Sequence, residues 1–416
     1  MAVKAPKGTK DVLPQDSYKW QYVESIAREI AFVAGYREIR TPVFEHTELF
    51  LRGVGDTTDI VQKEMYTFED KGGRSLSLKP EGTAGVVRAF IEGGLASQAQ
   101  PTKMFYLSTP VFRYERPQSG RLREHHQFGL EVFGAEDASI DAEVISMALK
   151  LFHMVGLKQL KLNINSIGCD KCRPQYNELL KDYLRDNLNS LCETCNDRFE
   201  KNPLRILDCK EEKCQSIVKN APMMIEHLCG ECSDHFEQLK QYLSAMDIAY
   251  SINPLIVRGL DYYTKTVFEI ISDSIGAQGT VCGGGRYDKL IKQIGGSDMA
   301  GIGFGMGIER LLLVMENEKI EIPKPSITDI YICTRGEQAR LIAVKLMQDL
   351  RNKGIKADMD HCNRGVKAQF KYADKIGAKK VIVIGEDEIA NGTYVVKDMQ
   401  DGTEQIVSHN ELLNLI

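Results

Sequence analysis

The stretch FRYERPQSGRLREHHQFGLEVFG, residues 112–134, predicts two strands joined by a charged turn. Its two ends, 112–114 and 129–133, have the aromatic and β-branched composition of strands. Its middle contains Pro117 and Gly120, which favour a turn. The sequence therefore predicts a β-hairpin, and the nature of the sheet that contains it follows from the residues on either side.

The hairpin is rich in charge, with four arginines, two adjacent histidines and three glutamates. Guanidinium groups this close repel one another unless an anion lies between them, and arginine matches phosphate and carboxylate oxygens well. One interpretation is therefore a clamp for a triphosphate or phosphoanhydride, and the other is a solvated charged loop. His125 and His126 could act as a general base, but a role in shaping the loop is the favoured interpretation.

The residues around the hairpin predict an α+β domain with an antiparallel sheet. Residues 17–34 have the apolar stripe of an amphipathic helix, with Ser17 as its N-cap and Gly35 at its end. Strands and helices follow without a strict alternation, which is typical of this class. The predicted strands are YREIR (36–40), KMFYLSTPVFRYER (103–116) and KLNINS (161–166), and a helix is predicted over 140–155.

The C-terminal residues follow a different pattern. A linker over 321–329 contains Pro323 and Pro325, which keep the chain extended. The strands DIYICT, IKADMD and KKVIVIG then alternate with helices over 336–352 and 364–376. This alternation predicts a small α/β domain with a mostly parallel sheet over 328–416, after a first domain over 1–325.

The bulk composition is that of an ordinary globular protein. The chain has 416 residues, of which 43% are hydrophobic and 27% charged, enough for two or three domains. No apolar run is long enough to cross a bilayer, and the first residues lack the apolar core of a signal peptide, so we expect the cytosol. The net charge of −5 does not indicate a nucleic-acid partner, although a local basic face would suffice for one.

A second informative stretch is AGIGFGMGIERLLLVME, residues 300–316. Four glycines recur in it with period two, so on a strand they share one face and the apolar side chains share the other. Glycines weaken a strand, so something must approach the bare face closely, and a flat ring such as adenine would fit. Arg310, near the start of the following helix, would favour an anion nearby.

Three further stretches carry carboxylates, tyrosines and one arginine. They are LKPEGTAGVVRAF (78–90), VRGLDYYTKTVFEI (257–270) and GGGRYDKL (283–290). Together these residue types suit a small ligand with an ammonium group, a carboxylate and a planar ring. Taken singly, each stretch is better explained as an ordinary turn or a half-buried aromatic.

The five stretches together resemble the histidyl-tRNA synthetases of the bacterial type, which belong to class II of the aminoacyl-tRNA synthetases. The resemblance covers nearly the whole chain, beginning with KGTKDVLP (7–14). TPVFEHTELF (41–50) resembles the first class II motif, the charged hairpin the second, and GIGFGMGIER (301–310) the third. RGLDYYT and GGGRYD resemble the two histidine-specific signatures, which are the most specific part of the match.

The resemblance implies a fold and an activity. The expected fold is α+β: a class II antiparallel-sheet catalytic core with a helical insertion, followed by a C-terminal α/β anticodon-binding domain. The expected activity is activation of L-histidine by ATP with Mg²⁺ to histidyl-adenylate, and transfer to the 3′ end of tRNA(His). The family also implies a homodimer.

The resemblance assigns roles to individual residues as well. Arg258 and Arg113 would be catalytic and act at the α-phosphate, because fixed cations suit a reaction that brings a carboxylate and ATP together. ATP would contact Arg113, Glu115, Arg121 and Arg310. The histidine would contact Glu81, Thr83, Arg113, Gln127, Glu131, Arg258, Tyr262, Tyr263 and Tyr287.

Eight of the eleven cysteines lie in a charged, helical region over 169–240, which interrupts the first domain. A reducing cytosol disfavours disulfides, and repeated CxxC pairs indicate zinc. A helix over 174–190 would separate the first two CxxC pairs by ~25 Å, too far for one tetrahedral ion with ~2.3 Å Zn–S bonds. A second helix, over 215–228, would return the chain over a similar distance.

We therefore predict two nested four-cysteine sites, with reduced, metal-free thiols as the alternative. Zinc is not a general feature of the family, so here the chain departs from the family pattern. One site would close the far end of the insertion, through Cys192, Cys195, Cys209 and Cys214. The other would close its base, through Cys169, Cys172, Cys229 and Cys232.

Two non-catalytic functions are the alternatives to the synthetase. A synthetase-like regulatory subunit of histidine biosynthesis typically lacks the anticodon domain and part of the histidine signature. A sensor of uncharged tRNA would be expected to have lost residues such as Arg113 or Arg310. The chain retains all of these features, so catalysis is favoured.

The predicted anticodon domain contains a basic helix after DHCNRG. Cationic side chains there would make salt-dependent contacts to the RNA backbone, while unstacked loop bases would carry specificity. For any single residue a solvated helix face is about as good an explanation. The candidates are Arg364, Lys367, Lys371 and Tyr372.

Overall fold

A computed structural model describes residues 2–55, 58–117, 120 and 122–412. The chain divides into two compact units, Met1–Ile322 and Pro323–Ile416, and each is described by itself. Among the described residues, no helix has both the length and the apolar character needed to cross a membrane.

An eight-stranded sheet forms the centre of the first unit. Every pair from β5 to β7 is antiparallel, and the two outermost pairs are parallel. The predicted hairpin is confirmed: its two arms are neighbours, with Phe112 opposite Glu124. The order is β1 (Arg37–Glu38), β5 (Thr102–Phe112), β6 (Glu124–Phe133), β11 (Gly301–Gly307), β10 (Thr280–Arg286), β9 (Thr264–Ser272), β7 (Leu160–Ser166) and β8 (Ser251–Ile252).

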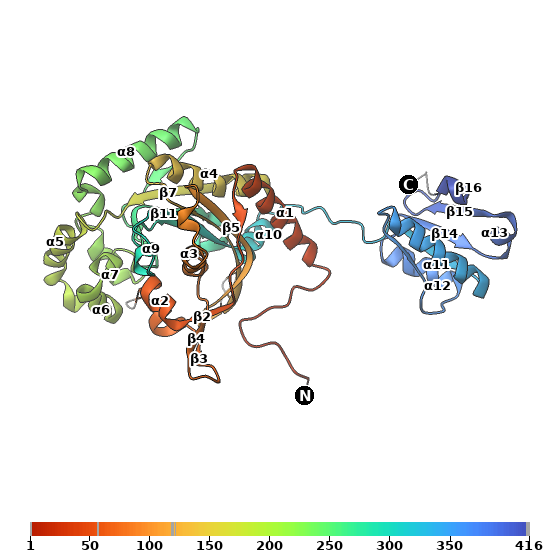
Figure 1. The fold of residues 1–416 in the computed structure, drawn as a ribbon, viewed down its shortest axis with the longest axis horizontal. Coiled ribbons are helices and arrows are strands. Elements are labelled where there is room, and N and C mark those ends of the chain that lie inside the picture. Colours follow the sequence, from red (N-terminus) through yellow and green to blue (C-terminus); the bar gives the residue numbers. More distant parts are fainter. Residues whose placement is uncertain (1, 56–57, 118–119, 121, 413–416) are drawn as a thin grey trace. The chain divides into compact units, whose positions relative to one another are not determined.

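Four helices pack on one face of this sheet (Figure 1). They bury the apolar side chains that alternate with the glycines of β11, such as Ile302 and Phe304. The largest hydrophobic core therefore lies on this face and leaves the opposite face for polar chemistry. The helices are α1 (Ser17–Val33), α4 (Ala138–Met154), α8 (Gly230–Ala245) and α10 (Ile308–Asn317).

The start of α1 differs from the prediction. Asp16 occupies the N-cap position, without a side-chain capping bond, so the prediction that Ser17 caps the helix is wrong. Ser17 is the first helical residue, and its hydroxyl donates to the Pro14 carbonyl at 3.1 Å. This local bond competes with capping for the same hydroxyl. Gly35, at φ +80°, follows the helix end as expected.

A small three-stranded antiparallel sheet projects from the first unit (Figure 1). Phe44 and Phe68 lie on it, 52% and 43% exposed, with their rings edge to face. Strand β4 leads into the stretch 78–90, whose helix begins at Thr83. The strands are β2 (Phe44–His46), β4 (Ser75–Leu78) and β3 (Thr67–Glu69), and helices of the same unit are α2 (Thr47–Val54), α3 (Thr83–Glu92) and α9 (Leu290–Gln293).

The cysteine-rich region is helical but more broken than predicted. The helix predicted over 174–190 ends at Arg185, where a run of Asp, Asn and Ser disfavours continuation. The helix predicted over 215–228 stops at Val218, because Pro222 cannot continue it. The helices are α5 (Arg173–Arg185), α6 (Glu193–Lys201) and α7 (Glu212–Val218).

Helix α8 joins the cysteine-rich region to the central core. Cys232 lies in its first turn, while Phe236, Leu239 and Leu243 are buried against α4 and the sheet. The helix runs without a break through residue 240, so the region is anchored directly in the core.

The second unit contains a mixed sheet. The three predicted strands pair in parallel, but two further strands are antiparallel, so the prediction of a mostly parallel sheet is wrong. The missed signal is the Asp401-Gly402 turn, a typical hairpin connection. The sheet order is β13 (Ala357–Met359), β12 (Ile330–Thr334), β14 (Lys380–Ile384), β15 (Thr393–Asp398) and β16 (Glu404–Ser408), with helices α11 (Glu337–Asn352), α12 (Val366–Lys375), α13 (Glu386–Asn391) and α14 (His409–Leu412).

Candidate active site

A cavity of about 670 Å³ opens on the sheet face opposite the helical layer. Strands β6, β9, β10 and β11 and the start of α10 form its wall, and the cysteine-rich region contributes Asp208, Lys210 and Gln215. The cavity brings together residues that are far apart in sequence. Those predicted from the motifs are Arg113, Glu115, Gln127, Arg258 and Arg310.

Backbone carbonyls orient two of the arginines in this cavity. Arg113 donates from Nε to the Pro80 carbonyl at 2.9 Å, and Arg310 donates from Nη1 to the Thr280 carbonyl at 2.7 Å. Such bonds fix the direction of a guanidinium group. Arg121, the fourth predicted ATP contact, lies outside the described residues.

Arg258 is held by both its backbone and its side chain. Its φ of +62° is unusual for a residue with a Cβ atom. Its guanidinium forms an ion pair with Glu269 and lies over Gly283. A Cβ atom at Gly283 would lie 2.5 Å from Arg258 Cζ, so only glycine leaves room for this side chain. Glu269 also accepts a hydrogen bond from Thr280 at 3.1 Å.

Two buried carboxylates lie behind the cavity. Glu81 accepts hydrogen bonds from the amides of Thr83 (2.8 Å) and Ala84 (2.7 Å) at the start of α3. Glu131, on β6, accepts one from the Thr83 hydroxyl at 2.7 Å. Burial raises the pKa of Glu81 above its usual range. Burial, with a contribution from the charge of Glu81, raises the pKa of Glu131 to about 8.

Tyrosine side chains surround Glu131. Tyr287 donates its hydroxyl to one carboxylate oxygen, and Tyr106 lies 3.4 Å from the other. Tyr262 packs against Tyr263 and Tyr287, with ring centroids 4.7 and 5.5 Å away. Tyr106 was not predicted. The available signal was a pair of glycines, because Gly82 and Gly129 are both positions where a Cβ atom would clash with the Tyr106 ring.

The predicted histidine contacts therefore fall into two groups. Arg113, Arg258 and Gln127 line the cavity. The Gln127 Oε1 atom is buried and has no hydrogen-bond partner among the described residues, so it is well placed to bind a ligand donor. The remaining residues form a tightly bonded cluster around Glu131: Glu81, Thr83, Tyr262, Tyr263 and Tyr287.

A buried ion pair positions Tyr287. The preceding residue, Arg286, is completely buried and donates from Nε to Asp141 at 2.7 Å. Asp141 also bonds His235 of α8 at 2.8 Å. A buried arginine with several fixed acceptors holds the end of β10 in one place. The tyrosine that follows is thereby directed toward Glu131.

The glycine face of β11 only partly matches the prediction. At Gly301 a Cβ atom would meet the Tyr287 ring, and at Gly303 it would meet the Glu131 carboxylate. The close approach at these two positions is thus made by the protein's own side chains and not by a ligand. Gly305 and Gly307 line the cavity, so only this half of the strand could face an adenine ring.

The charged hairpin also serves a structural purpose. Arg123 stacks on Tyr114 at 4.1 Å and donates to the Glu115 carbonyl at 3.1 Å, so this arginine is bound within the loop. His126 bonds Glu309 at 2.9 Å through Nδ1, and this carboxylate raises the histidine pKa. These contacts support the interpretation that His126 shapes the loop.

The eight predicted cysteines form two clusters with the predicted membership. Within each cluster the four sulfur atoms lie within 4.8 Å of one another. Individual Sγ–Sγ distances are 3.8 Å for Cys169 and Cys172, 3.7 Å for Cys169 and Cys229, and 3.8 Å for Cys192 and Cys209. A disulfide requires ~2.05 Å, whereas a tetrahedron with ~2.3 Å Zn–S bonds has edges of ~3.8 Å. The sulfur positions fit a bound zinc ion.

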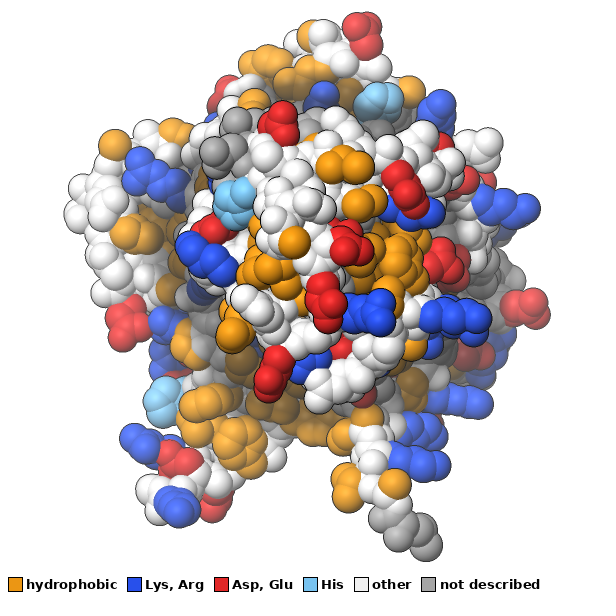
Figure 2. All heavy atoms as spheres, turned by 90° about the vertical axis from the view of Figure 1, so that its right-hand side faces the viewer, with side chains coloured by type: hydrophobic (Ala, Val, Ile, Leu, Met, Phe, Trp, Pro, Cys, Tyr) orange, Lys and Arg blue, Asp and Glu red, His pale blue; other side chains and the backbone are white. Residues whose placement is uncertain are grey.

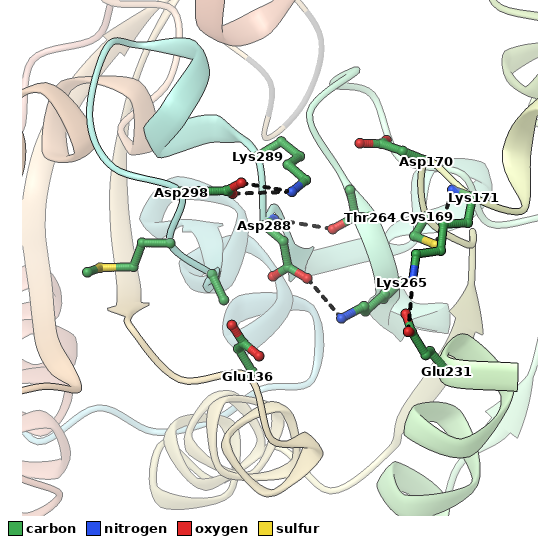
Figure 3. A pocket seen from close by; sticks show the side chains of 12 residues that line it. Glu136, Cys169, Asp170, Lys171, Glu231, Thr264, Lys265, Asp288, Lys289 and Asp298 are labelled. Atoms are coloured by element: carbon green, nitrogen blue, oxygen red, sulfur yellow. Dashed lines mark hydrogen bonds and ion pairs between the residues drawn. The ribbon is translucent and has the colours of Figure 1, made fainter. Parts of the chain in front are cut away.

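A second hollow, of about 370 Å³, lies beside Cys169 (Figure 3). Its lysines are paired with acids of the same wall: Lys171 with Glu231 at 2.8 Å and Lys265 with Asp288 at 3.2 Å. Lys289 likewise pairs with Asp298 (Figure 3). Each of these three lysines has an acidic neighbour, and that weakens the hollow as a candidate anion site.

The chain matches two family models. The model described as histidyl-tRNA synthetase matches residues 8–311, and the model described as anticodon binding domain matches residues 329–416. The two matches divide the chain at the same place as the two compact units.

Similar proteins were found among both sequences and solved structures. A histidine–tRNA ligase from Clostridium botulinum is 58% identical over 416 residues, which is 100% of this chain and 99% of that protein. One from Caldanaerobacter subterraneus is 58% identical over 412 residues, or 99% of each chain. The apo histidyl-tRNA synthetase of Staphylococcus aureus has a TM-score of 0.86 at 42% identity and covers 100% of this chain and 99% of its own. The chain belongs to the histidyl-tRNA synthetase family.

Proposed function

We propose that the chain activates L-histidine with ATP and Mg²⁺ and transfers the histidyl group to the 3′ end of tRNA(His). The observation that carries this function is the meeting of two sets of residues at one cavity. The arginines Arg113, Arg258 and Arg310 line it, and behind it lies the cluster in which Glu131 is bonded to Tyr287 of the histidine signature GGGRYD. Relatives 58% identical over the whole chain are histidine–tRNA ligases.

In the first step a carboxylate oxygen of histidine attacks the α-phosphorus of ATP, and pyrophosphate leaves. Both reactants are anionic, so fixed cations must position them and stabilise the charge that builds up. We assign this role at the α-phosphate to Arg113 and Arg258, and the β- and γ-phosphates to Arg310 together with Arg121. Glu115 would lie near the adenine amino group.

The cluster around Glu131 would select the amino acid. The carboxylates Glu81 and Glu131 would bind the α-ammonium group, and Gln127 Oε1 would accept a hydrogen bond beside them. Tyr263 and Tyr287 would contact the imidazole. A buried polar site of this kind rejects analogues that leave its groups unpaired.

In the second step the terminal ribose hydroxyl of the tRNA attacks the acyl carbon, and AMP leaves.

The second unit would bind the anticodon. On α12, Lys367 and Lys371 are exposed one turn apart, while Arg364 stacks on Tyr372 at 4.2 Å and pairs with Asp360. The two lysines are thus better candidates for phosphate contacts than Arg364. Figure 2 shows one face of the molecule, on which basic and acidic side chains are mixed.

We also propose that both cysteine clusters hold structural zinc. The sulfur geometry fits a closed tetrahedral site, with the ion supplying cross-links to a region whose helices are short. Thiols that bind metal rather than form disulfides agree with a cytosolic protein.

A homodimer is proposed through the exposed apolar surface of the small sheet, where Phe44 and Phe68 lie.

A non-catalytic regulatory function is less well supported. The structure of a protein titled ATP phosphoribosyltransferase regulatory subunit/histidyl-tRNA synthetase, from Bacillus halodurans, has a TM-score of 0.63 at 23% identity. That likeness concerns the fold alone. The present chain keeps the arginines and the tyrosine cluster in one place, which a purely regulatory protein would not need.

Replacing Arg258 tests the activation step. Histidine-dependent ATP–pyrophosphate exchange is expected in the wild type, with no exchange for the other amino acids. Arg258→Ala should lower the exchange rate by ~100-fold or more, because a cation at the reacting phosphate is lost. Arg185→Ala is the matched control, since its ion pair with Asp182 is more than half exposed. Exchange that survives in Arg258→Ala would contradict the assigned role.

The pKa of Glu131 predicts a pH dependence of histidine binding. Below about pH 8 the carboxyl group is mostly protonated and cannot form an ion pair with the α-ammonium group. Affinity measured by calorimetry should therefore rise several-fold between about pH 7 and 8, with proton release on binding. Glu131→Gln should bind more weakly and without this slope. If the affinity of the wild type for histidine did not change between about pH 7 and 8, the assignment would be refuted.

The zinc proposal predicts two ions per chain in protein purified without chelator. Cys169→Ser and Cys192→Ser should each lose one ion, because each removes a ligand from a different cluster. Cys362→Ser, an exposed cysteine outside both clusters, should keep both ions. Elemental analysis by plasma mass spectrometry gives the count. Fewer than one zinc per wild-type chain would end the two-site proposal.

A further inference from the structure

The loop from Arg258 to Tyr263 has a backbone that needs outside support. Arg258 is in the left-handed region at φ +62°, a conformation that persists only where its surroundings hold it. The loop precedes β9 and contains no regular hydrogen-bonded element of its own. The groups that hold this loop therefore decide where the Arg258 guanidinium lies.

The cysteine-rich region supplies several of these groups. Arg205 donates from Nη1 to the Gly259 carbonyl at 3.1 Å, and the same nitrogen lies 3.7 Å from the Asp261 carboxylate. Asn202 donates to the same carboxylate oxygen at 2.9 Å. Arg173 donates to the Tyr263 carbonyl. Contacts from the region thus reach residues 259, 261 and 263, directly after Arg258.

These contacts are built into the fold and are not loose surface pairs. The Arg205 side chain is only 12% exposed and that of Asp261 20%. On its other side Asp261 is confined by α2, since its amide lies 3.3 Å from the Val54 carbonyl and a Cβ atom at Gly55 would clash with the carboxylate. Loss of a partner from a partly buried charged hydrogen bond leaves the remaining group poorly satisfied.

Two of the residues that make the contacts, Asn202 and Arg205, lie in the segment that carries the distal cysteine cluster, which consists of Cys192, Cys195, Cys209 and Cys214. Asn202 and Arg205 lie on the short turn between Cys195 and Cys209, two of its members. The same turn leads to Asp208 and Lys210, which line the cavity. The distal cysteine cluster is therefore connected to the loop 258–263 through Asn202 and Arg205.

We infer that Arg205, assisted by Asn202, is a positioning residue for catalysis. From its place in the cysteine-rich region, Arg205 binds the loop 258–261 and thereby keeps the Arg258 guanidinium at the cavity. This inference rests on the proposed role of Arg258. It gives the cysteine-rich region a part in the activation step itself, through Gly259 and Asp261, and not only in the stability of the fold.

Arg205→Ala tests the inference in the full chain. Because Arg258 is assigned to the reacting phosphate, its misplacement should lower kcat for histidine-dependent pyrophosphate exchange ~10- to 100-fold, a larger factor than the rise in KM for histidine. Asn202→Ala should give a smaller loss in the same direction. Arg205→Lys should recover part of kcat, because a cation can still reach the Gly259 carbonyl. Arg185→Ala, an exposed arginine of the same region, should match the wild type.

Amide hydrogen exchange gives a second readout that does not depend on activity. Peptides covering 256–263 should exchange faster in Arg205→Ala than in the wild type, with β5 and β6 unchanged. A wild-type kcat with unchanged exchange in this loop would overturn the inference. If the wild type showed no histidine-dependent activity, the proposed function would fail, and faster exchange in the variant would still support the structural contact.

Discussion

The first unit depends on a constraint of space: charged and aromatic side chains must lie flat across the middle of an antiparallel sheet. Side chains on neighbouring strands of one face normally fill that space themselves. Here glycines leave it open, so that Arg258 lies over Gly283, Tyr287 over Gly301 and the Glu131 carboxylate beside Gly303. The opposite face carries the apolar side chains of the same strands and holds the sheet to its helices.

Burial then changes the ionisation of the carboxylate among these side chains. A carboxylate that is fully enclosed cannot ionise as it would in water, and the pKa of Glu131 rises to about 8 for that reason. Arginines in the neighbouring cavity are directed by carbonyl groups or by Glu269. In the proposed function, the cluster around Glu131 would recognise an ammonium group and a ring, and the arginines of the cavity would bind phosphates. The cysteine-rich region contacts the loop that carries Arg258.

The sequence allowed much of this arrangement to be predicted, for physical reasons. The hairpin, the period-two glycines and the cysteine spacing are local patterns, and their geometry follows from strand and helix dimensions alone. Tyr106 was missed because the two glycines that make room for its ring, Gly82 and Gly129, lie in different stretches of sequence, and only the folded position of β5 brings them to it. Likewise, nothing in the sequence around Arg205 indicates that it reaches Gly259, 54 residues away. The last two strands of the second unit were not predicted; they pair in antiparallel fashion across the Asp401-Gly402 turn.

The most direct test of whether glycines must leave space for these side chains is the pyrophosphate exchange rate of Gly283→Ala. The added Cβ atom would lie 2.5 Å from Arg258 Cζ, at the end of a flexible side chain, so the fold can adapt while the guanidinium must move. We expect the Gly283→Ala protein to have the circular dichroism spectrum and thermal midpoint of the wild type. Its pyrophosphate exchange rate should be at least ~10-fold lower. An intact Gly283→Ala protein with wild-type exchange would show that open space beneath Arg258 is not what the site requires.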